Sequence, residues 1–166
     1  MKKLIILLIA ITSATFAEAP QDLSGTYTYV VGQNPGIAKA IESIIANMSF
    51  LSRPIARSRL TQTNEPPQSV QMRITSKDVS IVHGQKSLPK VPLNNLPVEW
   101  IKPDGESMQV SVRFQGGKLI QTFQGKEGRR IDTYTFGTDG KSLSMDVEVS
   151  SSRLPQALRY QLLYRR

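Results

Sequence analysis

The sequence of 166 residues contains no cysteine, one histidine and one tryptophan. The lack of cysteine excludes disulfide bonds, zinc–thiolate sites, thiol catalysis and lipoprotein-type acylation of a cysteine. A single histidine excludes a multi-histidine metal site and leaves little material for a nucleophile–base pair. Gly-x-Ser-x-Gly, His-Glu-x-x-His and phosphate-loop motifs are also missing. The sequence therefore predicts a protein that is not an enzyme and that uses neither a metal nor a cofactor.

Long hydrophobic runs are also lacking. The apolar stretch Leu4–Ile11 is too short to cross a bilayer. It follows two lysines and precedes small residues, with Thr15 and Ala17 at the −3 and −1 positions of a cut before Glu18. This pattern is typical of a secretory signal peptide over residues 1–17.

Two alternatives stay open for this segment. A cut after Ala19 also fits the small-x-small rule, although Pro20 would then follow the cleaved bond, and the segment could instead remain as an N-terminal anchor. Removal of residues 1–17 takes away two lysines and leaves 149 residues with a net charge of +6. We expect a single domain over residues 18–166, exported to the periplasm or secreted, with no transmembrane segment after cleavage.

The positive charge of the remaining chain is spread rather than concentrated. Its basic doublets are Arg129-Arg130 and Arg165-Arg166. Nucleic-acid binding requires a concentrated basic stripe, with aromatic platforms for single strands. We therefore expect no nucleic-acid partner.

Helical signals are confined to one region near the start. A strand is predicted over residues 24–31, because aromatic and β-branched residues follow a glycine. Asn34 is a good N-cap, and apolar residues at helical spacing predict a helix over 35–51. A second short helix is predicted over 54–60, followed by a loop over 61–68.

After this region the pattern changes to alternation with a period of two. Turn residues recur every eight to twelve positions, which favours antiparallel hairpins in a closed barrel or a sandwich. The predicted total is about nine strands, and residues 84–97 are expected to be a long connection. The strands expected after the helical region cover 69–75, 79–83, 98–102, 109–114, 119–123, 131–136, 142–149 and 158–164.

Three segments carry a resemblance to the lipocalin-like (calycin) proteins. Leu23–Tyr27 resembles the Gly-x-Trp opening of lipocalins, with tyrosine replacing tryptophan. Tyr134–Leu143 and Tyr164–Arg166 resemble the penultimate hairpin and the last strand of small exported bacterial members. The helical pair after the first strand instead resembles fatty-acid-binding proteins, in which it covers the barrel. The resemblance implies an up-and-down β-barrel of 8–10 strands with a helical lid.

The resemblance also implies a structural role for Gly25 and Tyr27. In lipocalins the corresponding aromatic ring packs against an arginine of the last strand at the closed end of the barrel. Here Arg159 or Arg165 is expected to lie over Tyr27 in a cation–π contact.

The inward-facing residues of the strands either fill the barrel or line a cavity. In the second interpretation the protein holds a small hydrophobic or amphipathic molecule, including an anionic lipid-like one. The cavity candidates are Met72, Ile74, Val112, Phe114, Phe123, Tyr134, Phe136, Met145, Tyr160 and Leu162.

The helical segment has an apolar face and a basic tail. Either it packs over one end of the barrel with solvated charges, or it forms a portal lid that attracts an anionic lipid or a membrane surface. The lid candidates are Ile41, Ile45, Met48, Arg57 and Arg59.

Two titratable residues are predicted to differ in exposure. His83 is expected to be exposed at a hairpin end, whereas Asp132 shares its alternation with Tyr134 and is expected to point inward, paired with Arg113 or Arg130.

The alternative function is a filled barrel that binds a protein, as an inhibitor or an envelope scaffold without a small ligand. An exposed patch over residues 84–104 would favour that alternative.

Overall fold

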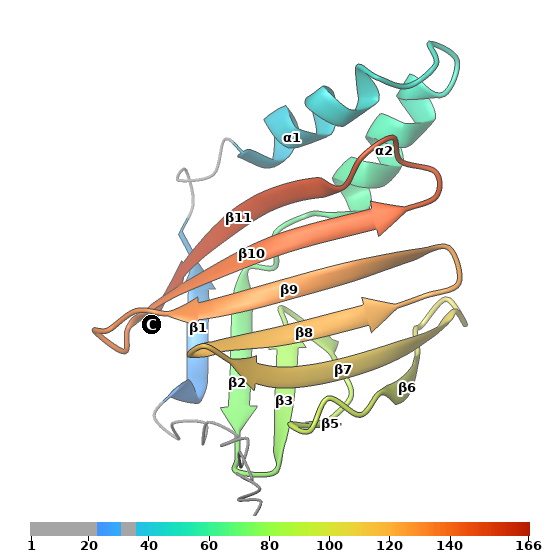
Figure 1. Ribbon diagram of the computed structural model, residues 1–166. Helices are drawn as coiled ribbons and strands as arrows, with labels where there is room; N and C mark the ends of the chain where they lie inside the picture. The colour runs from blue at the N-terminus through green and yellow to red at the C-terminus, as the bar shows by residue number, and fades with distance from the viewer. Residues whose placement is uncertain (1–22, 31–35) are drawn as a thin grey trace, which may run out of the picture.

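The computed structural model describes residues 23–30 and 36–166 (Figure 1). The predicted signal peptide and the predicted N-cap at Asn34 lie outside these residues. Within them the elements in chain order are β1 (Gly25–Tyr29), α1 (Gly36–Ile45), α2 (Arg53–Thr63), β2 (Ser69–Ile74), β3 (Asp78–His83), β4 (Lys86–Ser87), β5 (Val91–Pro92), β6 (Val98–Ile101), β7 (Ser107–Gln115), β8 (Lys118–Gln124), β9 (Gly128–Phe136), β10 (Ser142–Ser151) and β11 (Leu158–Arg165).

The described strands form one curled antiparallel sheet. Its hydrogen-bonded order is β4-β3-β2-β1-β11-β10-β9-β8-β7-β6, and β5 pairs with β3. Most neighbours are consecutive hairpins, but β1 lies between β2 and β11, which brings the first strand beside the last (Figure 1). The fold is mainly β, as expected, with both helices between the first and second strands.

A short crossing segment joins the two sides of the curled sheet. Val91 and Pro92 pair with β3, and the Leu93 amide donates to the carbonyl of Lys77 at 2.9 Å. Asn94 then forms a bridge with Arg113 of β7, and the Asn95 amide donates to Val112 at 3.1 Å. Residues 91–95 therefore span the gap between β3 and β7.

Residues 84–97 are thus not the plain connection that the sequence predicted. They contain β4 and β5, whose two-residue lengths leave no alternation to detect. Asn95 has φ 63°, a left-handed conformation that asparagine tolerates better than most residues.

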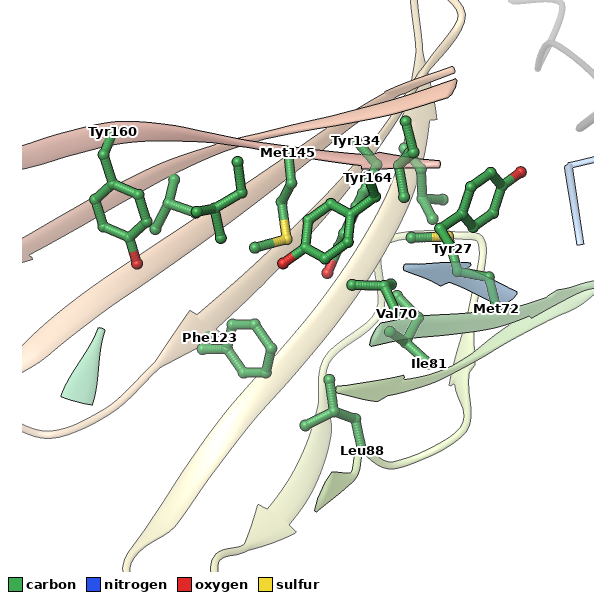
Figure 2. Packing of buried hydrophobic residues seen from close by; sticks show 14 of the residues in the cluster. Tyr27, Val70, Met72, Ile81, Leu88, Phe123, Tyr134, Met145, Tyr160 and Tyr164 are labelled. Carbon is green, nitrogen blue, oxygen red and sulfur yellow. The ribbon is translucent and has the colours of Figure 1, made fainter. Parts of the chain in front are cut away.

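The period-two alternation correctly predicted which residues face the interior. In β2, Val70, Met72 and Ile74 are buried, whereas Gln71 and Arg73 are exposed. The same alternation runs through β7 to β11, so side chains from both sides of the sheet meet in one hydrophobic cluster (Figure 2). This cluster is the interior of the barrel.

The first helix is shorter than the sequence predicted, and the second is longer. The helix expected to reach residue 51 ends at Ile45, where Asn47 bonds back to Ser43 and the Arg53 guanidinium donates to the carbonyls of Ala46 and Met48. The second helix continues to Thr63, beyond the predicted end at residue 60, so the loop shrinks to residues 64–68. Neither described helix has the length and apolarity needed to cross a membrane.

The arginine over Tyr27 is Arg166, not Arg159 or Arg165. Its guanidinium carbon lies 5.2 Å from the ring centroid. The reason is the alternation of β11: Tyr160, Leu162 and Tyr164 point inward, so residues 159 and 165 point outward and are exposed. Arg159 instead donates to Glu148 at 2.9 Å.

Gly25 lies beside the side chain of Arg166. A Cβ atom at this position would lie 2.5 Å from Nε of Arg166. Glycine therefore provides the space that the guanidinium occupies on its way to the Tyr27 ring.

Candidate ligand-binding interior

The apolar interior contains a cluster of polar side chains. Asp132 is completely buried on β9, and its Oδ1 accepts a bond from Nε of Arg130 at 2.7 Å. Both side chains point inward because they share the alternation of Tyr134. Of the two partners that the sequence left open for Asp132, the structure selects Arg130.

The Arg130–Asp132 pair leaves one carboxylate oxygen unsatisfied. Oδ2 of Asp132 is buried without a hydrogen-bond partner, and so is the hydroxyl oxygen of Tyr164 on β11. Burial raises the pKa of Tyr164, and the negative charge of Asp132 adds to the rise. Two polar atoms of this kind in one apolar interior are costly, because burial removes their hydrogen bonds with water.

A second part of the polar cluster centres on Tyr134. Its hydroxyl donates to Oε1 of the buried Gln121 at 3.1 Å and lies 2.8 Å from Nε2 of His83. Since this hydroxyl donates to Gln121, it can accept from a neutral His83 that carries its proton on Nε2. Burial lowers the pKa of His83 to about 4, which keeps the ring neutral near pH 7.

His83 is therefore not the exposed residue that the sequence predicted. It is half-buried and continues the inward alternation of Val79 and Ile81 on β3. That alternation was visible in the sequence, but the adjacent Gly84 indicated a hairpin end. Gln121, between Leu119 and Phe123, carried the same signal of an inward polar residue.

The third part of the polar cluster links the barrel to the helices. The Tyr160 hydroxyl donates to Oδ1 of Asn64 at 3.0 Å, and Nδ2 of Asn64 donates to the carbonyl of Leu60 at 2.8 Å. Asn64 follows directly after α2 and is buried. Nothing in the sequence singled it out, because it lies in a stretch predicted to be a loop.

The predicted cavity residues come together in the interior. Figure 2 shows Met145 and Tyr160 pointing inward from the long strands, with Val70 and Ile81 on strands across the interior. Phe114 and Phe136 are half-buried against this cluster, and the remaining candidates are buried: Met72, Ile74, Val112, Phe123, Tyr134, Met145, Tyr160 and Leu162.

The inward side chains of both sides of the sheet form one buried hydrophobic cluster. Two hollows, of about 220 and 340 Å³, lie near the turn ends of the long hairpins. Tyr164 lines the first and Arg129 the second, and neither hollow is lined by a helical residue.

The helical candidates divide into an inner and an outer set. Ile41 and Ile45 are buried and Met48 is partly buried, so they hold α1 against the barrel. Arg57 and Arg59 are exposed. Arg57 forms a two-bond pair with Glu42, at 2.7 and 2.8 Å, which connects α2 to α1.

Comparisons with known proteins agree on the fold. No protein-family model matches the sequence, and no curated protein matches it significantly. Solved structures do match: fatty-acid-binding protein 1 of Echinococcus granulosus has a TM-score of 0.56 at 12% identity, covering 89% of this chain and 98% of that one. A Schistosoma mansoni fatty acid binding protein in complex with arachidonic acid has a TM-score of 0.55 at 13% identity, covering 89% and 98%.

A third matching structure is not named as a fatty-acid-binding protein. An abundant heat soluble (SAHS) protein of Ramazzottius varieornatus has a TM-score of 0.57 at 10% identity, covering 90% of this chain and 98% of that one. At such identities the matches establish the fold alone. The expected mainly β fold with a helical insert after the first strand is confirmed, as a curled antiparallel sheet with two short helices.

Proposed function

We propose that the protein is a non-enzymatic binding protein that holds an amphipathic, lipid-like molecule inside the barrel. The apolar chain of the ligand would lie among the inward side chains, including Phe123 and Met145. Its polar head would lie at the polar cluster around Arg130 and Asp132.

The Arg130–Asp132 pair, in which Asp132 is fully buried and Arg130 partly buried, supports this function. A barrel that serves only as a scaffold gains nothing from such a pair, because apolar residues of similar volume are often as stable or more stable. A polar anchor surrounded by apolar side chains is, by contrast, what an amphipathic ligand requires. Two of the matching folds are named as fatty-acid-binding proteins, which supports the same class of ligand.

Native mass spectrometry of the protein purified without detergent tests this function. We expect a stoichiometric small molecule that is lost on denaturation and that organic extraction recovers. A bare polypeptide mass, together with no uptake of added lipid, would favour the alternative of a filled barrel with a protein partner.

Fluorescence provides a second readout, because Trp100 is the only tryptophan and packs near Phe123, with ring centroids 6.1 Å apart. Lipid uptake is expected to change its emission. Phe123→Leu should weaken binding several-fold through lost apolar contact. The matched control is Ile101→Ala on neighbouring β6, a residue that is 65% exposed and should leave binding unchanged.

A second proposed role concerns the turn between the helices. Phe50 and Leu51 are 79% and 84% exposed there, and Arg53 and Arg59 lie nearby in the sequence. Exposed apolar side chains among basic ones suit contact with an anionic membrane surface. We propose that this turn is where lipid is received or delivered.

The proposed location is outside the cytoplasm, in the periplasm or the medium. The pattern of residues 1–17 supports export. Expression of the full chain in a bacterium, followed by mass measurement of the extracytoplasmic protein, tests it. We expect a protein that begins at Glu18, and a full-length mass confined to the cytoplasm would contradict export.

A further inference from the structure

The polar cluster is balanced in charge before any ligand arrives. Arg130 and Asp132 neutralise each other, and His83 is neutral at pH 7. Among the fully buried residues described, Asp132 is the charged one. A ligand carboxylate placed here would meet an arginine that is already paired and a carboxylate of its own sign.

The hydrogen-bond inventory of the cluster leaves one carboxylate oxygen without a donor. Nε of Arg130 is used on Oδ1 of Asp132, and the hydroxyls of Tyr134 and Tyr160 donate to Gln121 and Asn64. Oδ2 of Asp132 still needs a donor, and the Tyr164 hydroxyl can both donate and accept. A carboxylate accepts only, so it cannot satisfy Oδ2.

We propose that the interior selects an amphipath with an uncharged, hydrogen-bond-donating head, a hydroxyl or a primary amide, in preference to a fatty carboxylate. The head would donate to Oδ2 of Asp132, with the Tyr164 hydroxyl as its second partner. This inference rests on the proposed function, since it names the ligand class of the same site.

Three probes with one chain and different heads test the selection. Dodecanol donates and accepts, laurate accepts and is charged, and methyl laurate accepts and is neutral. Binding at neutral pH is measured by calorimetry and by the emission of Trp100. We expect dodecanol to bind roughly tenfold more tightly than either of the others, since its head satisfies a buried acceptor that theirs leave unpaired.

Two variants identify the residues responsible. Asp132→Asn keeps the shape, removes the negative charge and leaves Arg130 without a neutralising partner. It should therefore invert the order, so that laurate binds more tightly than dodecanol. Asp146→Asn makes the same chemical change on the outer side of β10, where Asp146 accepts from Gln161, and should keep the order.

Tyr164→Phe is a second variant that tests the same head-group contact if the Asp132→Asn protein does not fold. Because the Tyr164 hydroxyl has no partner within the described structure, its removal should not destabilise the protein. It should nevertheless weaken dodecanol binding by roughly threefold to tenfold, while methyl laurate is less affected.

The outcomes separate this inference from the function on which it rests. If no probe binds, the proposed function itself fails. If either laurate or methyl laurate binds as tightly as dodecanol, the protein binds lipid-like molecules as proposed. The inferred preference for a hydrogen-bond-donating head is then wrong. An order that Asp132→Asn leaves unchanged would also overturn the inference.

Discussion

Arg166 lies over the ring of Tyr27, with its guanidinium carbon 5.2 Å from the ring centroid. The same guanidinium donates to the Ser24 carbonyl, and the Tyr27 hydroxyl donates to the carbonyl of Leu23 at 3.0 Å. One arginine at the end of the last strand therefore holds the start of the first.

Replacement of Arg166 should weaken the contact between the last strand and the first strand, and so lower the stability of the protein. Arg166→Ala is expected to lower the free energy of unfolding by about 1 kcal/mol, through loss of the cation–π contact and the hydrogen bond. Urea denaturation measures the change. Arg165→Ala, which alters an exposed outward residue, is the control and should have little effect.

Gly25 and Arg166 should behave as a coupled pair. Gly25→Ala would place a Cβ 2.5 Å from Nε of Arg166, so the guanidinium must move, and the wild-type protein should lose stability through the weakened contact of Arg166 with Tyr27. In the Arg166→Ala background the obstacle is gone, and the same change should cost less. Equal costs in both backgrounds would show that the space at Gly25 is not reserved for the guanidinium.

The bond between Tyr160 and Asn64 should control how firmly the helices are held. Tyr160→Phe removes the donor and leaves Oδ1 of the buried Asn64 unpaired, so we expect a loss of about 1–3 kcal/mol. Limited proteolysis should then cut the helical segment faster. Gln62→Ala, at an exposed position on α2, is the control, and equal cleavage rates would contradict the link.

Stability should fall on mild acidification because of His83. Its pKa is lowered from 6.5 to about 4 by burial and by nearby Arg130 and Lys86, while Asp132 opposes the shift. Between these values the unfolded chain binds a proton that the folded protein does not. Stability is therefore lost as pH falls from about 6.5 to 4, at up to about 1.4 kcal/mol per pH unit.

Denaturation at a series of pH values measures this loss, and His83→Gln should abolish it. The residues Glu42, Asp78 and Asp104 have lowered pKa values, so their stabilising effect is lost at lower pH, below about 4.5. A decline between pH 6.5 and 4 that persists in His83→Gln would assign the effect to other groups.

The turn between the helices should contact anionic membranes. Phe50→Ser combined with Leu51→Ser should reduce co-sedimentation with phosphatidylglycerol vesicles severalfold without lowering stability, because both side chains are exposed. Vesicles of neutral phosphatidylcholine are the comparison. Unchanged sedimentation would indicate that this turn is not a membrane contact.

The sequence predicted the β-sheet well because its signal is local. Alternation in β2 and β7 to β11 identified the inward residues one strand at a time. It failed where elements are too short for a period, as in β4 and β5, and at helix ends set by side-chain bonds to the backbone, such as those of Arg53.

The polar cluster could be predicted only in part. Alternation placed Asp132 inward, but His83 was assigned to the surface and the choice between Arg113 and Arg130 required the packed structure. Asn64 joins the cluster through a contact with Tyr160, far away in the sequence, which no local pattern reveals. The site is thus assembled by tertiary contacts between residues whose local patterns are individually weak.

The position of β1 beside β11 has a consequence for the order of folding. Strands β7 to β11 pair with their sequence neighbours, so their hairpins can form early, whereas Thr28 must find Arg165 near the other end of the chain. Such distant pairings carry a high loop-closure cost and are slow. We expect pulsed hydrogen exchange to protect β8–β10 first and β1 last, so that the interior stays open to water until β1 is in place between β2 and β11.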